Sequence, residues 1–159
     1  MIQLDMSKVF DKICWEYMRQ VLKAFGFHKD NIKWIMAMVL REFFSILLNG
    51  SPSQPINPTR GIRQGDPISP FLFVIMAEGL SCSIFAAFHS YKLSSLQTYA
   101  SSPPTMHQKF VDDTLLMGLL IIIEASSFKS IFSDFSAASG TTINPENSKL
   151  LFFKTMLSI

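Results

Sequence analysis

Residues 110–120 read FVDDTLLMGLL and hold two adjacent acids, Asp112 and Asp113, between apolar neighbours. The alternation of apolar residues predicts two short strands around the acidic pair. Neighbouring carboxylates in apolar surroundings repel each other and lose solvation, which penalises their charged forms. A divalent cation relieves this penalty, and Mg²⁺ prefers oxygen ligands such as carboxylates. An isolated Asp-Asp pair is usually a solvated turn, so a metal site needs support from other segments.

Two further segments supply that support. Residues 4–11, LDMSKVFD, place Asp5 directly after an apolar strand residue, and residues 60–70, RGIRQGDPISP, form a glycine-flanked loop with two arginines and a glutamine. One carboxylate from a strand and a pair from a neighbouring hairpin could hold two divalent ions about 3.5–4 Å apart. Such a clamp stabilises the attacking and leaving oxygens of an in-line displacement at phosphorus. Each segment alone is weak, and their order and spacing together favour this chemistry.

The rest of the chain predicts an α+β fold. Apolar residues at helical spacing predict helices at residues 15–25 before Gly26, from Asp30 or Asn31 to about 39, at 71–88, and at 124–138 before Gly140. Further strands are expected at residues 1–5 and 43–48, the latter ending in an Asn49-Gly50 turn. Residues 51–70 and 91–106 are expected to be irregular, and residues 143–144 and 149–153 to form a final hairpin.

The composition is apolar for a separate domain. Charged residues make up 16% of the chain, apolar residues 48%, and the mean hydropathy is +0.28. Either a membrane or the rest of a larger protein could cover such a surface. The longest apolar run, residues 115–123, is much shorter than the ~20 residues of a spanning helix, which favours a partial domain without a membrane partner. The net charge of +2 gives no global signature of nucleic-acid binding, and two cysteines give neither a disulfide framework nor zinc-ligand spacing.

Several segments resemble the reverse transcriptases of non-LTR retrotransposons, particularly the LINE type common in plants. They are LDMSKVFDKICW, LLNGSP, RGIRQGDPISPFLF, AEGLS, FVDDTLL and ASGTTIN. The resemblance covers nearly the whole chain and implies that residues 1–159 are a partial reverse transcriptase domain. Its fold would be a polymerase palm-like core, a small antiparallel sheet packed against helices, with the fingers and thumb largely missing and expected in a longer relative.

The resemblance also implies an activity and its partners. The expected reaction is RNA-directed DNA polymerisation by two-metal nucleotidyl transfer, from a dNTP to a primer 3′-hydroxyl. The expected cofactor is a pair of Mg²⁺ ions, with Mn²⁺ as a substitute, and the partners are an RNA template and a DNA primer. The sequence does not give a cellular address, and nuclear action is an expectation from the family alone.

The resemblance assigns the acids and an aromatic residue. Asp5, Asp112 and Asp113 match the family's catalytic metal ligands, and Asp112 is the first choice within the pair. Phe10 matches the aromatic residue that packs under the incoming sugar, although without the resemblance an aromatic residue here would more often be part of a core. Asp11 matches a second acid of the same motif, without an assigned role.

The glycine-flanked loop is the expected substrate-binding segment. Arg63, Gln64 and Gly65 match positions beside the template base and incoming nucleotide. Gly65 permits close approach of a nucleotide to the backbone, and Gln64 can both donate and accept hydrogen bonds. The residues expected to shape the loop are Asp66, Pro67, Ser69 and Pro70.

Some positions depart from the family pattern. Val111 replaces the usual alanine, and Gln108 and Lys109 stand where apolar strand residues are usual. Two successive polar residues in a strand put one of them on the inner face. Asn147 replaces a lysine that assists the leaving pyrophosphate, with Lys149 two residues later. These departures, together with the expected lack of fingers and thumb, support an alternative, a catalytically inactive retrotransposon remnant that is at most a weak nucleic-acid or protein-interaction module.

Overall fold

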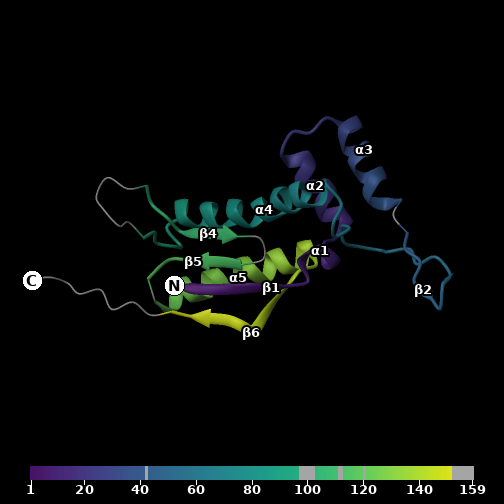
Figure 1. The fold of residues 1–159 in the computed structure, drawn as a ribbon. Helices are drawn as coiled ribbons and strands as arrows, with labels where there is room; N and C mark the ends of the chain where they lie inside the picture. Colours follow the sequence, from purple (N-terminus) through teal and green to yellow (C-terminus); the bar gives the residue numbers. More distant parts are fainter. Residues whose placement is uncertain (42, 97–102, 111–112, 120, 152–159) are drawn as a thin grey trace, which may run out of the picture.

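A four-stranded antiparallel sheet forms the centre of the molecule (Figure 1). The computed structural model describes residues 1–41, 43–96, 103–110, 113–119 and 121–151. The strand order is β4 (His107–Phe110), β5 (Asp113–Leu116), β1 (Ile2–Ser7) and β6 (Thr142–Leu150). The first strand of the chain therefore lies inside the sheet, between two strands from its C-terminal half.

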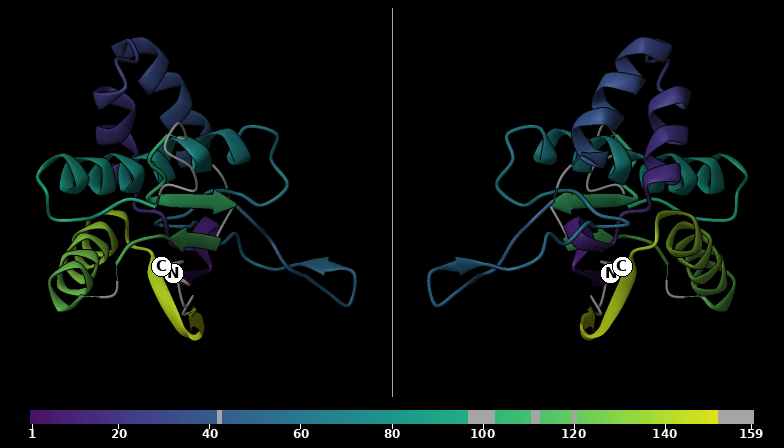
Figure 2. Two further views of the ribbon diagram at one scale, coloured as in Figure 1. Left: turned by 90° about the vertical axis from the view of Figure 1, so that its left-hand side faces the viewer. Right: turned by 90° about the vertical axis from the view of Figure 1, so that its right-hand side faces the viewer.

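Helices cover one face of this sheet. The long helices α4 (Ser69–His89) and α5 (Ile122–Ser139) pack against each other, and α2 (Trp15–Ala24) contacts both. Helix α3 (Lys29–Leu40) packs on α2, and the short α1 (Val9–Lys12) directly follows β1. A hairpin of β2 (Leu47–Leu48) and β3 (Ser51–Pro52) projects away from the sheet (Figure 2). This architecture confirms the expected α+β class and palm-like core.

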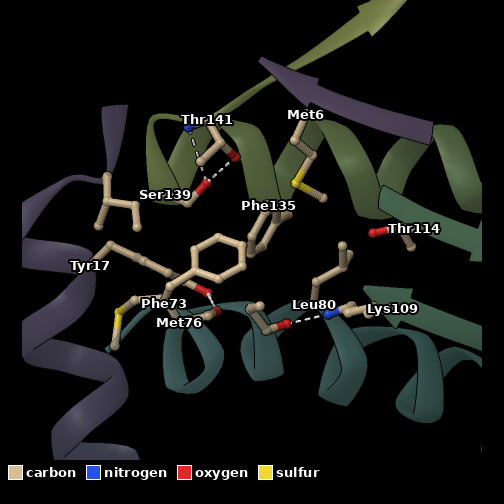
Figure 3. A pocket seen from close by; sticks show the side chains of 12 residues that line it. Met6, Tyr17, Phe73, Met76, Leu80, Lys109, Thr114, Phe135, Ser139 and Thr141 are labelled. Carbon is tan, nitrogen blue, oxygen red and sulfur yellow. Dashed lines mark hydrogen bonds between the residues drawn. The ribbon is translucent and has the colours of Figure 1, made fainter. Parts of the chain in front are cut away.

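The core lies between the sheet and the two long helices. Leu4 and Met6 of β1 and Leu116 of β5 are buried there, because alternate strand residues point to the same face. Figure 3 shows part of this interior, where side chains of α2, α4, α5 and the sheet converge. The cavity among them, ≈ 10 Å³, has room for about one water molecule and not for a ligand. The opposite face of the sheet carries Gln3, Asp5 and Ser7 of β1 and Asp113 and Leu115 of β5, which alternate with the core residues.

Most predicted elements are confirmed, with corrections at their ends. The expected helices at 15–25, 71–88 and 124–138 correspond to α2, α4 and α5, and Gly140 ends α5 with φ 78°. The predicted N-cap of the second helix, Asp30 or Asn31, is wrong. Helix α3 begins at Lys29, because the side chain of His28 caps it by accepting from the backbone N–H of Asp30. The predicted strand at 43–48 is wrong in length. Only residues 47–48 form a strand, since this segment projects into solvent with few partners.

The predicted C-terminal hairpin is wrong. Residues 142–150 form one strand, β6, and both ends of it pair with β1. The extra residues between these ends bulge out opposite Leu4, which accounts for the turn-like sequence there. Residues 152 and 153 of the expected hairpin lie outside the described part of the chain.

Helix α4 is long and apolar enough to cross a membrane, judged by length and composition. Core helices of globular folds have the same properties, and one side of α4 is buried against the sheet and α5. The residues of this buried side include Leu72, Met76, Leu80 and Ile84.

Candidate metal site on the open face of the sheet

Asp5 and Asp113 occupy directly opposite positions on neighbouring strands. The β1–β5 register pairs them, the β4–β5 register pairs Phe110 with Asp113, and the β1–β6 register pairs Asp5 with Asn144. Opposite residues of an antiparallel pair point to the same face, with Cβ atoms about 4.5–5.5 Å apart. Because the neighbours of Asp5 along β1, Leu4 and Met6, are in the core, this row lies on the open face.

The two carboxylates have different surroundings. Asp5 is half-buried, and its Oδ2 accepts hydrogen bonds from the side-chain amides of Asn144 and Asn147, each at 3.0 Å. Asp113 is exposed. Asp112, the first choice within the acidic pair, lies outside the described residues, as does Val111. The structure therefore brings together two of the three predicted acids.

Phe10 and the glycine-flanked loop line a common hollow of ≈ 460 Å³. The ring of Phe10 stacks on Phe73 of α4 with centroids 5.0 Å apart, and it is only half-buried. Gln64 and Gly65 form another part of the wall, and both are exposed. Three predicted substrate-binding residues therefore meet at one hollow. The loop residues predicted to shape it, Asp66, Pro67, Ser69 and Pro70, complete its wall.

A second, more polar hollow of ≈ 530 Å³ lies beside the first and shares Gln64. Its wall includes Asp11 and two arginines, Arg60 and Arg63. Gln64 Nε2 donates to Asp11 Oδ1 at 3.1 Å, which orients the amide between the two hollows. The two guanidinium groups give this hollow a positive charge that suits phosphate groups.

The loop is fastened to α1 by its backbone. Gly61 N–H donates to the carbonyl of Ile13 at 2.8 Å, and Ile62 N–H donates to that of Phe10 at 2.7 Å. The Gly61 carbonyl accepts from the indole N–H of Trp15 at 2.7 Å. Gly61 has φ +87°, and a Cβ there would lie 2.7 Å from the carbonyl oxygen of Asp11. Only glycine permits this approach of the loop to the segment that carries Phe10.

Gln108 and Lys109 are successive residues of β4, so their side chains point to opposite faces of the sheet. Gln108 is exposed, whereas Lys109 points toward α4 and its Nζ donates to the carbonyl of Ala77 (Figure 3). Burial lowers the pKa of Lys109 to about 8, although the charges of Glu78 and Cys82 oppose this shift. Burial, together with the Lys109 charge, also lowers the pKa of His107, which Glu78 raises in part.

The donor set on the open face fits a hard divalent cation. Carboxylates are the preferred ligands of Mg²⁺, and two of them face the same side from adjacent strands. No cluster of three or more histidine, cysteine, aspartate or glutamate side chains occurs within the described ranges, from which Asp112 is missing. Among the described residues, Asp5 and Asp113 are the carboxylates that could contribute oxygen ligands to a bound ion on this face.

Three contacting residues were missed by the sequence analysis as parts of the site. Asp11 had no assigned role and binds Gln64, while Asn144 and Asn147 bind Asp5. The sequence held only a weak signal for them. Asn144 ends a segment that resembles the family and Asn147 departs from the family pattern, yet the contact of both with Asp5 depends on a strand pairing between the two ends of the chain.

A central antiparallel sheet with helices on one face and paired acids on the other has the architecture of a polymerase palm. The chain belongs to the reverse transcriptase family, because residues 1–156 match the family described as "Reverse transcriptase (RNA-dependent DNA polymerase)".

Two relatives place the chain within that family. It is 28% identical over 148 residues to the retrovirus-related Pol polyprotein of the type-1 retrotransposable element R2 from Popillia japonica, covering 91% of this chain and 23% of the polyprotein. It is 31% identical over 114 residues to an uncharacterized mitochondrial protein of Arabidopsis thaliana, covering 72% of this chain and 93% of that protein. The expected kinship with non-LTR retrotransposon reverse transcriptases is confirmed.

Solved structures confirm the fold. Telomerase from Candida albicans, in complex with a fragment of telomeric RNA, superposes with a TM-score of 0.72 at 12% identity, covering 97% of this chain and 27% of that one. Apo telomerase from Candida tropicalis gives a TM-score of 0.70 at 14% identity, covering 93% and 29%. The chain thus spans about a quarter of the telomerase chains and of the retrotransposon polyprotein.

Proposed function

We propose that this chain is the palm of an RNA-directed DNA polymerase that transfers a nucleotide from a dNTP to a primer 3′-hydroxyl on an RNA template. Family membership supports the reaction class and its dependence on a divalent metal. The ions that we propose are two Mg²⁺, with Mn²⁺ as a substitute. We further propose that residues 1–159 carry the reacting groups, and that fingers and thumb segments of a larger polymerase strengthen the binding of the template and primer.

The observation that carries the proposal is the register that sets Asp5 opposite Asp113. Like charges directly opposite each other destabilise a sheet. A cation held between them removes the repulsion and gives the pair a function. The proposed catalytic and metal-binding residues are Asp5, Asp112 and Asp113.

Bound Mg²⁺ would supply electrostatic stabilisation of the attacking and leaving oxygens. The chain's own residues orient the substrates. Phe10, held by its stacking on Phe73, offers a rigid apolar surface for the sugar of the incoming nucleotide. Gln64, oriented by Asp11, contacts the template–nucleotide pair, and Arg63 contributes positive charge for the phosphates. Gly65 leaves the backbone open to the nucleotide, since nothing lies within 4 Å of the position that a Cβ would take.

The comparisons do not favour the inactive-remnant alternative, for which Gln108, Lys109 and Asn147 are the evidence within the sheet. Each of these polar side chains has a place in the fold. Gln108 is exposed, Lys109 binds a helix carbonyl and Asn147 binds Asp5. The sheet therefore forms with polar residues at positions 108 and 109 and with an asparagine at position 147.

Primer extension on an RNA template with Mg²⁺ tests the proposal. The wild-type chain is compared with Asp112→Asn and Asp5→Asn, and Asp134→Asn on the exposed face of α5 is the matched acid-to-amide control. We expect extension by the wild type and the control, and a loss of at least a hundredfold in both site variants, because charge stabilisation at phosphorus depends on the ligands. Equal extension by all four proteins would reject the catalytic assignment.

A further inference from the structure

The bulge of β6 wraps around the carboxylate of Asp5. Pairing between β1 and β6 passes from Gln3–Lys149 to Asp5–Asn144, so the four residues 145–148 lie opposite the single residue Leu4. A bulge of this kind redirects side chains that a regular strand would send elsewhere. Here it turns a second asparagine, Asn147, toward the same acid that Asn144 reaches.

Hydrogen bonds join the residues of the bulge to Asp5 and to one another. The amides of Asn144 and Asn147 both donate to Asp5 Oδ2, each at 3.0 Å. Ser148 Oγ accepts from the Asp5 backbone N–H at 3.3 Å and donates to the carbonyl of Asn144 at 2.7 Å. Asn144 Oδ1 accepts from the backbone N–H of Glu146 at 3.2 Å. The bulge is therefore braced internally and on Asp5.

We propose that Asn144 and Asn147 are positioning residues that hold Asp5 as a one-oxygen ligand for the divalent cation. This inference rests on the proposed function of Asp5. Both amides bind the same carboxylate oxygen, and Oδ1 accepts no hydrogen bond from the residues that the structure describes. The lone pairs of Oδ1 are left for a cation, and two donors on Oδ2 fix the rotation of the carboxylate. Partners that orient a ligand in this way tune metal affinity.

The side chain of Asn147 is uncharged. Its amide donates a hydrogen bond to Asp5 Oδ2 without neutralising the carboxylate. The negative charge of Asp5 is therefore left for a cation at Oδ1.

Mn²⁺ binding to the whole chain, followed by electron paramagnetic resonance of the free ion, tests the inference. We expect Asn147→Ala to weaken Mn²⁺ binding about tenfold, in the range usual for partners of metal ligands. Asn147→Gln keeps an amide donor and should stay within about threefold of the wild type. Asn31→Ala, on the exposed side of α3, is the matched control and should bind as the wild type does. Circular dichroism checks that each variant is folded.

A second readout separates positioning from a general structural role. In primer extension, saturating Mn²⁺ should restore the rate of Asn147→Ala to within about threefold of the wild type, because the lost affinity is overcome by concentration. A damaged fold would not be rescued in this way. Asn144→Ala also removes the brace to Glu146, so Asn147→Ala is the deciding variant.

The outcomes distinguish this inference from the proposed function. If Asp5→Asn abolishes Mn²⁺ binding while Asn147→Ala binds like the wild type, the positioning role is wrong and the metal site stands. If the wild type binds no Mn²⁺, or Asp5→Asn binds as well as the wild type, the metal site itself is wrong and the inference fails with it.

Discussion

At the scale of single residues, the site is a place where stability and function oppose each other. Asp5 and Asp113 lie opposite each other on adjacent strands, an arrangement that weakens a sheet unless a cation separates the charges. Among the described residues, two side-chain amides stabilise the carboxylate of Asp5 by donating to its Oδ2. Asp113 is exposed and can be changed without disturbing the core.

Asp113→Asn should therefore stabilise the metal-free protein while weakening metal binding. Removing the cross-strand repulsion should raise the free energy of unfolding by about 0.2–1 kcal/mol. Mg²⁺ should raise the melting temperature of the wild type, by linkage to the folded state, and have a smaller effect on the variant. Thermal unfolding with EDTA and with Mg²⁺ measures both effects. A variant that is less stable than the wild type in EDTA would show that Asp113 has a structural role instead.

At the scale of elements, the loop of residues 60–68 depends on its attachment to α1. Two backbone hydrogen bonds and the indole of Trp15 hold it there. Gly61 lies at the tightest approach and Gly65 at an open one, and both have positive φ. An alanine substitution at Gly65 therefore tests the cost of positive φ alone, whereas one at Gly61 tests this cost together with a steric clash.

Gly61→Ala should cost more stability than Gly65→Ala. Both variants place alanine at positive φ, which costs about 1–2 kcal/mol. Gly61→Ala adds a clash with the backbone of Asp11, at 2.7 Å, and should shift the loop away from Phe10. Urea unfolding of both variants measures the difference. Equal losses would mean that the Gly61 contact relaxes without consequence.

Lys109 on β4 makes the stability of the sheet depend on pH. Its pKa is lowered to about 8 by burial, so between about pH 8 and 10.5 the unfolded chain binds a proton that the folded chain has released. Stability from this group therefore rises as the pH rises through that window, and the penalty is fully present below it.

Lys109→Met removes the charge and keeps an unbranched side chain facing α4. We expect it to stabilise the protein at pH 7 by about 1–2 kcal/mol, a value reduced for the partial exposure of the amine. The advantage should shrink as the pH rises from about 8 toward 10.5. Urea unfolding at pH 7, 8.5 and 10 measures the trend. A difference that does not change with pH would contradict the assigned pKa.

The sequence predicted elements well where the signal is local. Helices α2, α4 and α5 follow from apolar spacing, and Gly140 and Asn49-Gly50 mark real turns. The prediction failed for β6, since a strand that pairs with β1 across the length of the chain leaves no local pattern around its bulge. The motifs and the resemblance predicted that Asp5 and the acidic pair belong to one site. They did not predict that Asn144 and Asn147 contact Asp5, because that contact depends on the same long-range pairing.

At the scale of the whole molecule, large apolar side chains remain exposed on several elements. They lie on residues 43–48, where Leu47 is 71% exposed, on α3 and on the N-terminal end of α4. The exposed residues of these elements include Trp34, Phe43, Ile46, Leu48, Phe71 and Val74. Apolar surface of this extent is typical of faces that other protein covers.

Self-association of the isolated chain should follow from this surface. We expect oligomers at tens of micromolar, and fewer of them in the double variant Phe43→Ser, Leu47→Ser, which removes apolar area from the hairpin without touching the core. Sedimentation velocity measures the distribution. Monomeric wild-type protein at high concentration in plain buffer would contradict the prediction.

The central claim is that Asp5 and Asp113, opposite each other on the open face of the palm, hold a divalent cation. Isothermal titration calorimetry of Mg²⁺ into the wild-type chain and into Asp5→Asn tests it most directly. The proposed site predicts a binding isotherm for the wild type and only heats of dilution for the folded variant. Indistinguishable isotherms from the two proteins would contradict it.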